Sequence, residues 1–128
     1  MRTIKFRGKV ADEPNEWVYG YLSSKDVIYQ PKETENSKCC GAGTFKVIVE
    51  TIGQYTGLHD KNGKEIYEGD ILYYLIYEQC TRVGKVEYID DMTGFFFVFG
   101  GKSKCIGSIL EGVEVIGNIY DNPKLLEV

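Results

Sequence analysis

Short runs of alternating apolar and polar residues recur along the chain, and clusters of glycine, proline, asparagine and aspartate separate them. Alternation with a period of two is typical of half-buried β-strands. The pattern predicts strands over residues 3–8, 17–22, 26–30, 44–51, 71–77, 84–89, 95–99 and 113–120. We therefore predict a mainly β chain, built of small antiparallel sheets or a barrel, with at most a short C-terminal helix.

The first two predicted strands should pair as an antiparallel hairpin with a long loop between them. Trp17, Tyr19 and Tyr21 share one face of the second strand, while Val18 and Leu22 lie on the other. Both faces therefore carry apolar bulk. We expect one face in the core and the other under a loop or a partner subunit.

The segment from Thr51 to Ile71 is dense in turn signals. Asn62-Gly63 predicts a type I′ turn with positive φ at both residues, inside a reversal over 60–64. A second turn at Gly69-Asp70 should start the strand over 71–77. Side chains on this turn face could contact a ligand or partner, although most turn residues are only solvated. The candidates are Gln54, Tyr55, His59, Glu68 and Asp70.

The clearest hairpin joins 84–89 to 95–99 through a loop that ends in Gly94, which suits positive φ. The run Phe95–Phe99 has no polar face, so we expect cover on both sides. Residues 106–110 fit either a short strand or a helical turn. Gly117 suggests a bulge, and Asn122-Pro123 predicts a capped terminal turn docked by Leu125, Leu126 and Val128. From Gly69 onward the order of elements is similar to that of SH3-like barrels.

The chain has 128 residues, which fits a single domain over 1–128, with lobes 1–50 and 51–128 as the alternative division. The formal net charge of −4 argues against nucleic acid as the main partner. Lys5, Arg7 and Lys9 nevertheless share one face of the first strand. They would form an anion-binding edge or, as we favour, the solvated lysines of an edge strand.

No cofactor or metal site is predicted. Cys39 and Cys40 are adjacent, Cys80 and Cys105 are isolated, and the spacing of zinc knuckles is absent. His59 is the single histidine, which removes most Ser-His and Cys-His schemes. We therefore predict no catalytic residues. The N-terminus lacks an apolar signal segment and no apolar run could span a membrane, so we expect a cytoplasmic protein with reduced thiols.

Three blocks of sequence are similar to those of the YopX family of bacteriophage and prophage proteins. They are Ile4–Arg7, Thr51–Asp70 and Glu114–Pro123, in the family's order. The resemblance implies a β-rich fold and a phage or prophage origin inside a bacterial host. It implies no activity, because the function of the family is unknown, and it supplies no catalytic residues.

Surplus aromatic side chains favour a non-enzymatic interaction module that self-associates, since exposed aromatics often anchor interfaces. They include Trp17, Tyr19, Tyr21, Tyr73, Tyr74, Tyr77 and Phe95–Phe99. We expect a homo-oligomer, with a phage or host protein as a further partner. The alternative is a small nucleic-acid-binding accessory or a small enzyme that uses the turn face over 54–70.

Overall fold

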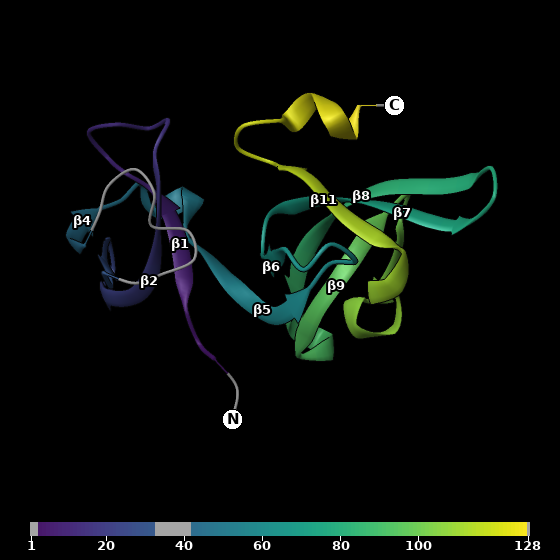
Figure 1. Ribbon diagram of the computed structural model, residues 1–128, viewed down its shortest axis with the longest axis horizontal. Helices are drawn as coiled ribbons and strands as arrows, with labels where there is room; N and C mark the ends of the chain where they lie inside the picture. The colour runs from purple at the N-terminus through teal and green to yellow at the C-terminus, as the bar shows by residue number, and fades with distance from the viewer. Residues whose placement is uncertain (1–2, 33–41, 128) are drawn as a thin grey trace. The chain divides into compact units, whose positions relative to one another are not determined.

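The computed structural model describes residues 3–32 and 42–127 and is mainly β, with open antiparallel sheets and only short 3₁₀-helices (Figure 1). The predicted fold class is confirmed, and the sheets do not close into a barrel. The chain divides into two compact units, residues 1–55 and 56–128. Strand β5 (Gly53–His59) starts in the first unit and ends in the second.

The first unit contains β1 (Phe6–Lys9), β2 (Trp17–Ser24), β3 (Val27–Gln30) and β4 (Gly43–Lys46). Together with the start of β5 they form antiparallel neighbours in the order β4-β3-β2-β1-β5. The predicted hairpin of the first two strands is confirmed. The hydrophobic core of this unit lies on one face of the sheet and consists of Val18, Ile28 and Val47.

The strand predicted over 44–51 is too long. It ends at Lys46, and Val49–Thr51 forms the 3₁₀-helix η1. The Thr51 hydroxyl donates to the carbonyl of Ile48 at 2.6 Å and accepts the N–H of Lys9 at 2.9 Å. The bond to Ile48 is local, of the kind that short hydroxyl side chains form in place of a sheet ladder, while the bond to Lys9 ties this turn to β1.

The second unit contains a five-stranded sheet in the order β10-β9-β8-β7-β11. Its strands are β7 (Asp70–Tyr77), β8 (Cys80–Ile89), β9 (Gly94–Phe99), β10 (Lys102–Cys105) and β11 (Val113–Asn118). The short strand β6 (Glu65–Tyr67) follows the reversal after β5. Strands β7 to β10 pair in chain order, and β11 returns to pair with β7. The sheet is open, whereas the similarity to SH3-like barrels predicted a closed one.

Short 3₁₀-helices lie between these strands and after the last one: η2 (Asp90–Met92), η3 (Ile106–Ser108), η4 (Leu110–Gly112) and, after β11, η5 (Pro123–Leu126). Residues 106–110 are therefore helical rather than extended. The bulge predicted at Gly117 is confirmed, because the β7–β11 register shifts between Val115 and Gly117. Asn122 does not cap η5, since its side-chain oxygen instead accepts the N–H of Asn118 at 3.2 Å.

The core of the second unit gathers around Phe97, whose side chain is fully buried. Its ring stacks on Phe99 at 4.9 Å and meets the ring of Tyr74 edge-on at 5.8 Å. Phe99 on the same face is buried too, and Phe96 and Val98 on the other face are half-buried, so both sides of this run are covered, the second only in part. Leu125 and Leu126 remain exposed, and Val128 lies outside the described residues.

Two turn predictions were wrong in detail. Gly63 has a φ of +85°, but Asn62 does not take positive φ, so the reversal is not a type I′ turn. The N–H of Gly63 donates to the carbonyl of Asp60 at 3.0 Å, which places Lys61 and Asn62 at the centre of the turn. In the loop after β8, Thr93 rather than Gly94 takes the left-handed conformation, with a φ of 47°.

We expect the Gly84→Ala variant to lose about 3 kcal/mol of unfolding free energy, because the new methyl group overpacks the sheet. A Cβ at Gly84 would lie 2.2 Å from the carbonyl oxygen of Val98, which is backbone and cannot move aside. Gly107→Ala is the matched control, since its Cβ meets nothing within 4 Å. Urea unfolding of both variants checks this expectation, and equal losses would contradict it.

Candidate functional site

The centre of the turn face, Asp60, is a structural carboxylate. Its side chain is buried and accepts the N–H groups of Asn62 at 2.8 Å and Lys64 at 2.9 Å. Its other oxygen accepts the N–H of Val115 at 2.9 Å. Asp60 therefore holds the reversal between β5 and β6 and ties it to β11, which explains the turn geometry without any ligand.

The second turn is also held by buried acidic side chains. Asp70 accepts the N–H of Tyr67 at 2.7 Å, and the Tyr67 hydroxyl donates to Glu65 at 3.0 Å. Gly69 allows this close reversal because its φ is +91°. Sequence reasoning named Asp70 and missed Glu65 and Tyr67, whose burial follows from their position on β6.

The predicted turn-face residues divide between the two units. Gln54 and Tyr55 belong to the first, where Tyr55 is buried and the Lys5 ammonium lies 5.0 Å from the centre of its ring. His59 is exposed at the end of β5, Glu68 is half-buried, and Asp70 is buried. Asp70 thus has a structural role, and among these five residues His59 is exposed while Gln54 and Glu68 are half-buried.

The aromatic side chains predicted on one face of β2 do share that face. Trp17 and Tyr19 are half-buried, while Tyr21 is 53% exposed. Their neighbour β1 lies between β2 and β5, so our interpretation of Lys5, Arg7 and Lys9 as edge-strand lysines was wrong. Pairing between residues far apart in sequence places this basic strand inside the sheet.

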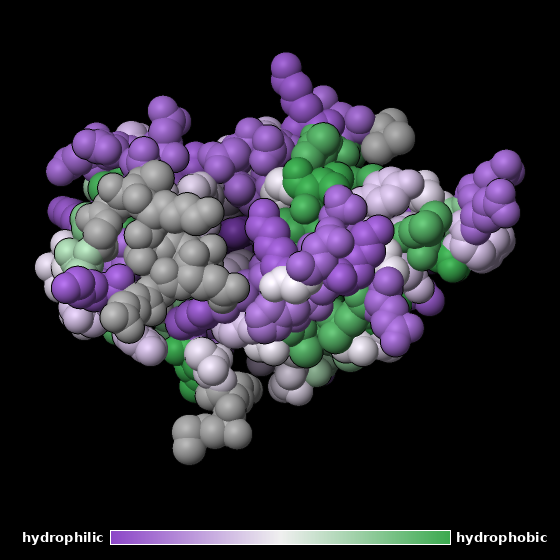
Figure 2. Space-filling view, in the orientation of Figure 1, coloured by the Kyte–Doolittle hydropathy of each residue, from purple (hydrophilic) through white to green (hydrophobic). Residues whose placement is uncertain are grey.

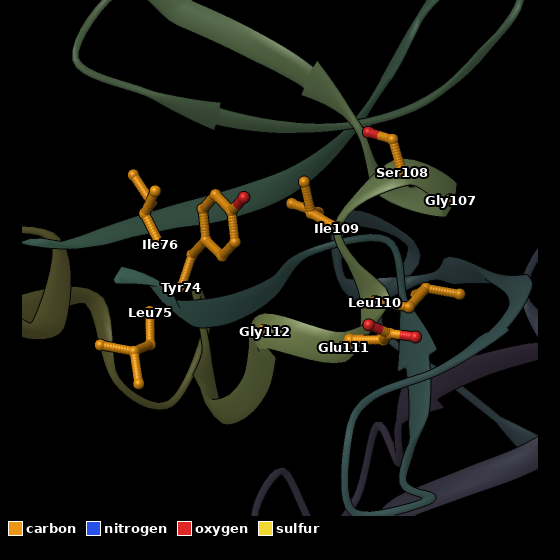
Figure 3. Close-up of a pocket in the computed structure, with 9 residues that line it drawn as sticks. All are labelled: Tyr74, Leu75, Ile76, Gly107, Ser108, Ile109, Leu110, Glu111 and Gly112. Atoms are coloured by element: carbon orange, nitrogen blue, oxygen red, sulfur yellow. The ribbon is translucent and has the colours of Figure 1, made fainter. Parts of the chain in front are cut away.

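A groove of about 720 Å³ lies beside the end of β7 (Figure 3). Its walls come from Tyr74–Ile76 and from the helical turns over Gly107–Gly112. Figure 3 shows the Tyr74 ring between Ile76 and Ile109, with Leu75 pointing to the opposite side of the strand. The groove therefore lies next to the apolar end of β7, and most of its own exposed lining is polar.

The end of the β7–β8 hairpin exposes three consecutive apolar residues. Leu75 is 43% exposed, Ile76 38% and Tyr77 68%. In Figure 2 apolar side chains lie beside the polar tip of this hairpin. Sequence reasoning named Tyr77 within the aromatic surplus and missed Leu75 and Ile76, although three apolar residues without polar alternation were the available signal.

The end of β7 also has an open backbone edge. Pairing with β11 stops at Tyr74–Val113, whereas pairing with β8 continues to Tyr77–Cys80. Within the described residues, Ile76 and Tyr77 therefore have a neighbouring strand on one side only. An exposed edge with apolar side chains is a template for a further strand.

The comparisons with known proteins agree with the resemblance in the sequence. The family model described as YopX protein matches residues 5–127. This chain belongs to the YopX family. The YopX-family chain is also similar to protein EF1440 from Enterococcus faecalis, a crystal structure, with 31% identity and a TM-score of 0.66. That match covers 98% of this chain and 99% of EF1440. Among curated proteins, none matches this chain.

Three further features of this YopX-family chain bear on the sequence predictions. Cys80 is half-buried on β8 and Cys105 is exposed on β10, whereas Cys39 and Cys40 lie outside the described residues. Over residues 3–32 and 42–127, no three His, Cys, Asp or Glu side chains form a group that could hold a metal ion. In the same part of the chain, every helix is too short to cross a membrane.

Proposed function

We propose that this protein is a non-enzymatic interaction module that self-associates through the end of β7. In this proposal it is a phage or prophage accessory protein that acts in the cytoplasm of a bacterial host. One observation carries the proposal: Leu75, Ile76 and Tyr77 expose apolar side chains beside a groove, and Ile76 and Tyr77 also lie on an open strand edge.

A second copy of the same chain fits this edge. Two identical edges can pair antiparallel about a two-fold axis, so the same surface serves both partners. Backbone hydrogen bonds would extend the sheet from one copy into the other. In such a pairing the Tyr77 end of each β7 runs toward the groove of the other copy. The exposed apolar side chains would then leave water on both sides.

The buried acidic residues support the non-enzymatic part of the proposal. Asp60 and Asp70 accept backbone N–H groups that shape their own turns, which is structural rather than catalytic work. The bacterial setting is supported by the family and by EF1440, which comes from the bacterium Enterococcus faecalis.

Amide hydrogen exchange tests the proposal at the level of the strand. We expect peptides that cover residues 75–77 to exchange more slowly as protein concentration rises, because pairing would protect the open edge. Strand β10 is the internal control: its residues are also exposed at a sheet edge, and Lys102 and Lys104 disfavour pairing there. Exchange over 75–77 that does not change with concentration, or protection confined to β10, would refute the proposal.

A further inference from the structure

The charges of the chain are segregated between the two units. Residues 1–55 contain eight Lys and Arg against seven Asp and Glu, whereas residues 56–128 contain seven against twelve. The net charge of −4 therefore comes from the second unit. Strands β1–β4 contain no Asp or Glu at all. The net charge of the whole chain therefore does not describe β1–β4, whose charged residues are all cations.

Those cations share a sheet face with aromatic rings. In the antiparallel register Arg7 lies opposite Tyr19 and Lys9 opposite Trp17, so each pair projects to one side. On the next strand Tyr29 lies opposite Tyr21. We call this surface the cationic aromatic face, and it consists of Lys5, Arg7, Lys9, Trp17, Tyr19, Tyr21 and Tyr29.

Cations and rings are in direct contact on this face. The Arg7 guanidinium lies 4.8 Å from the centre of the Trp17 ring, and the Lys9 ammonium lies 5.8 Å from the same ring. Cation–π contacts of this kind hold a ring and a positive charge side by side. Arg7 is buried and fixes Trp17 in place, while the half-buried Lys9 keeps part of its surface in water.

The outer part of the face is open to solvent. Tyr21 and Tyr29, paired across β2 and β3, are 53% and 44% exposed. The Asp26 carboxylate, which comes directly before β3, forms an ion pair with Lys46 at 3.9 Å. Two exposed rings side by side with lysines on a neighbouring strand offer flat stacking surfaces and positive charge together.

We infer that the cationic aromatic face binds single-stranded nucleic acid. Unpaired bases stack on exposed aromatic side chains while lysines contact the phosphates, and this combination tolerates any sequence. A binding surface for a purely anionic protein would need the cations but not the exposed rings. The inference concerns residues of the first unit and does not depend on self-association through β7.

Fluorescence anisotropy with a labelled oligothymidylate of about 16 nucleotides tests the inference. We expect a dissociation constant of about 10 µM at low salt, as for sequence-independent binding. Tyr21→Ala and Tyr29→Ala should each weaken binding about tenfold. The double variant Lys5→Gln/Lys9→Gln should reduce the slope of log K against log salt by about 0.7 for each lysine removed. Tyr88→Ala and Lys102→Gln, both exposed in the second unit, are the matched controls and should bind as the unaltered protein does.

Trp17 provides a second readout because it is the only tryptophan and lies on this face. Its fluorescence should be quenched as the oligonucleotide saturates the protein. Absence of binding at low salt, binding without quenching of Trp17, or equal weakening by the control variants would overturn the inference. Binding of heparin that matches the oligonucleotide, with both tyrosine variants unchanged, would also overturn it.

Discussion

Replacing Leu75 and Ile76 together with lysine is expected to raise the dissociation constant for self-association at least about a hundredfold. The two side chains lie on opposite faces of β7 and are 43% and 38% exposed, so both would be covered by a paired copy. Burial of such a side chain stabilises an interface by about 1.5–3 kcal/mol. Only about two-fifths of each side chain is exposed, but both copies contribute the pair, so the variant loses about 2.4–4.8 kcal/mol, against the roughly 2.7 kcal/mol that corresponds to a hundredfold change.

The variant also places like charges across the proposed two-fold axis, which adds repulsion. Sedimentation velocity would measure the change. A matched control is Met92→Lys/Leu125→Lys, two equally exposed apolar residues of the second unit away from the hairpin end. Urea unfolding of both double variants should differ little, since each change is at the surface. If the control dissociates as readily as the hairpin variant, the interface lies elsewhere.

Replacing Asp60 with alanine should lower the free energy of unfolding by about 3–5 kcal/mol. The carboxylate accepts three backbone N–H groups, from Asn62, Lys64 and Val115, in a buried position. A hydrogen bond to a charged group contributes about 1.5–3 kcal/mol, and buried donors left without partners add a penalty. Water that enters the vacated space would recover part of the loss.

The reversal itself would loosen because Asp60 joins it to β11. Chemical denaturation would measure the loss of unfolding free energy. The Asp60→Asn variant should lose less than Asp60→Ala, because its amide oxygen can still accept a hydrogen bond. Asp90→Ala is the control, because Asp90 is exposed in η2. A loss for Asp60→Ala no larger than that for Asp90→Ala would show that the turn does not depend on this carboxylate.

Local patterns predicted most of the strands because alternation and turn residues act over short distances. The start of β8 at Cys80 was missed for a physical reason. The preceding turn has Gln79 in the left-handed conformation, with a φ of 66°, so no glycine or asparagine marks it. The 3₁₀-helix over Val49–Thr51 was missed because it depends on Lys9, which is 42 residues away from Thr51.

The candidate surfaces were predicted only in part. Alternation along each strand correctly placed Lys5, Arg7 and Lys9 on one face of β1. It also placed the aromatic residues together on one face of β2. The pairing of β1 with β2 brings the basic and aromatic residues onto one shared face. Strand pairing also places β1 between β2 and β5, and local alternation predicts neither result. The open edge of β7 depends on where β11 begins, at Val113, which no local pattern in either strand reveals.

The most direct test of the central claim is the mass of the purified protein in solution, measured by light scattering from low to high micromolar concentration. Self-association through the end of β7 predicts a mass that rises toward twice that of one chain. It also predicts that the Leu75→Lys/Ile76→Lys variant stays at the mass of one chain throughout. A single-chain mass for the unaltered protein at every concentration would contradict the proposed function.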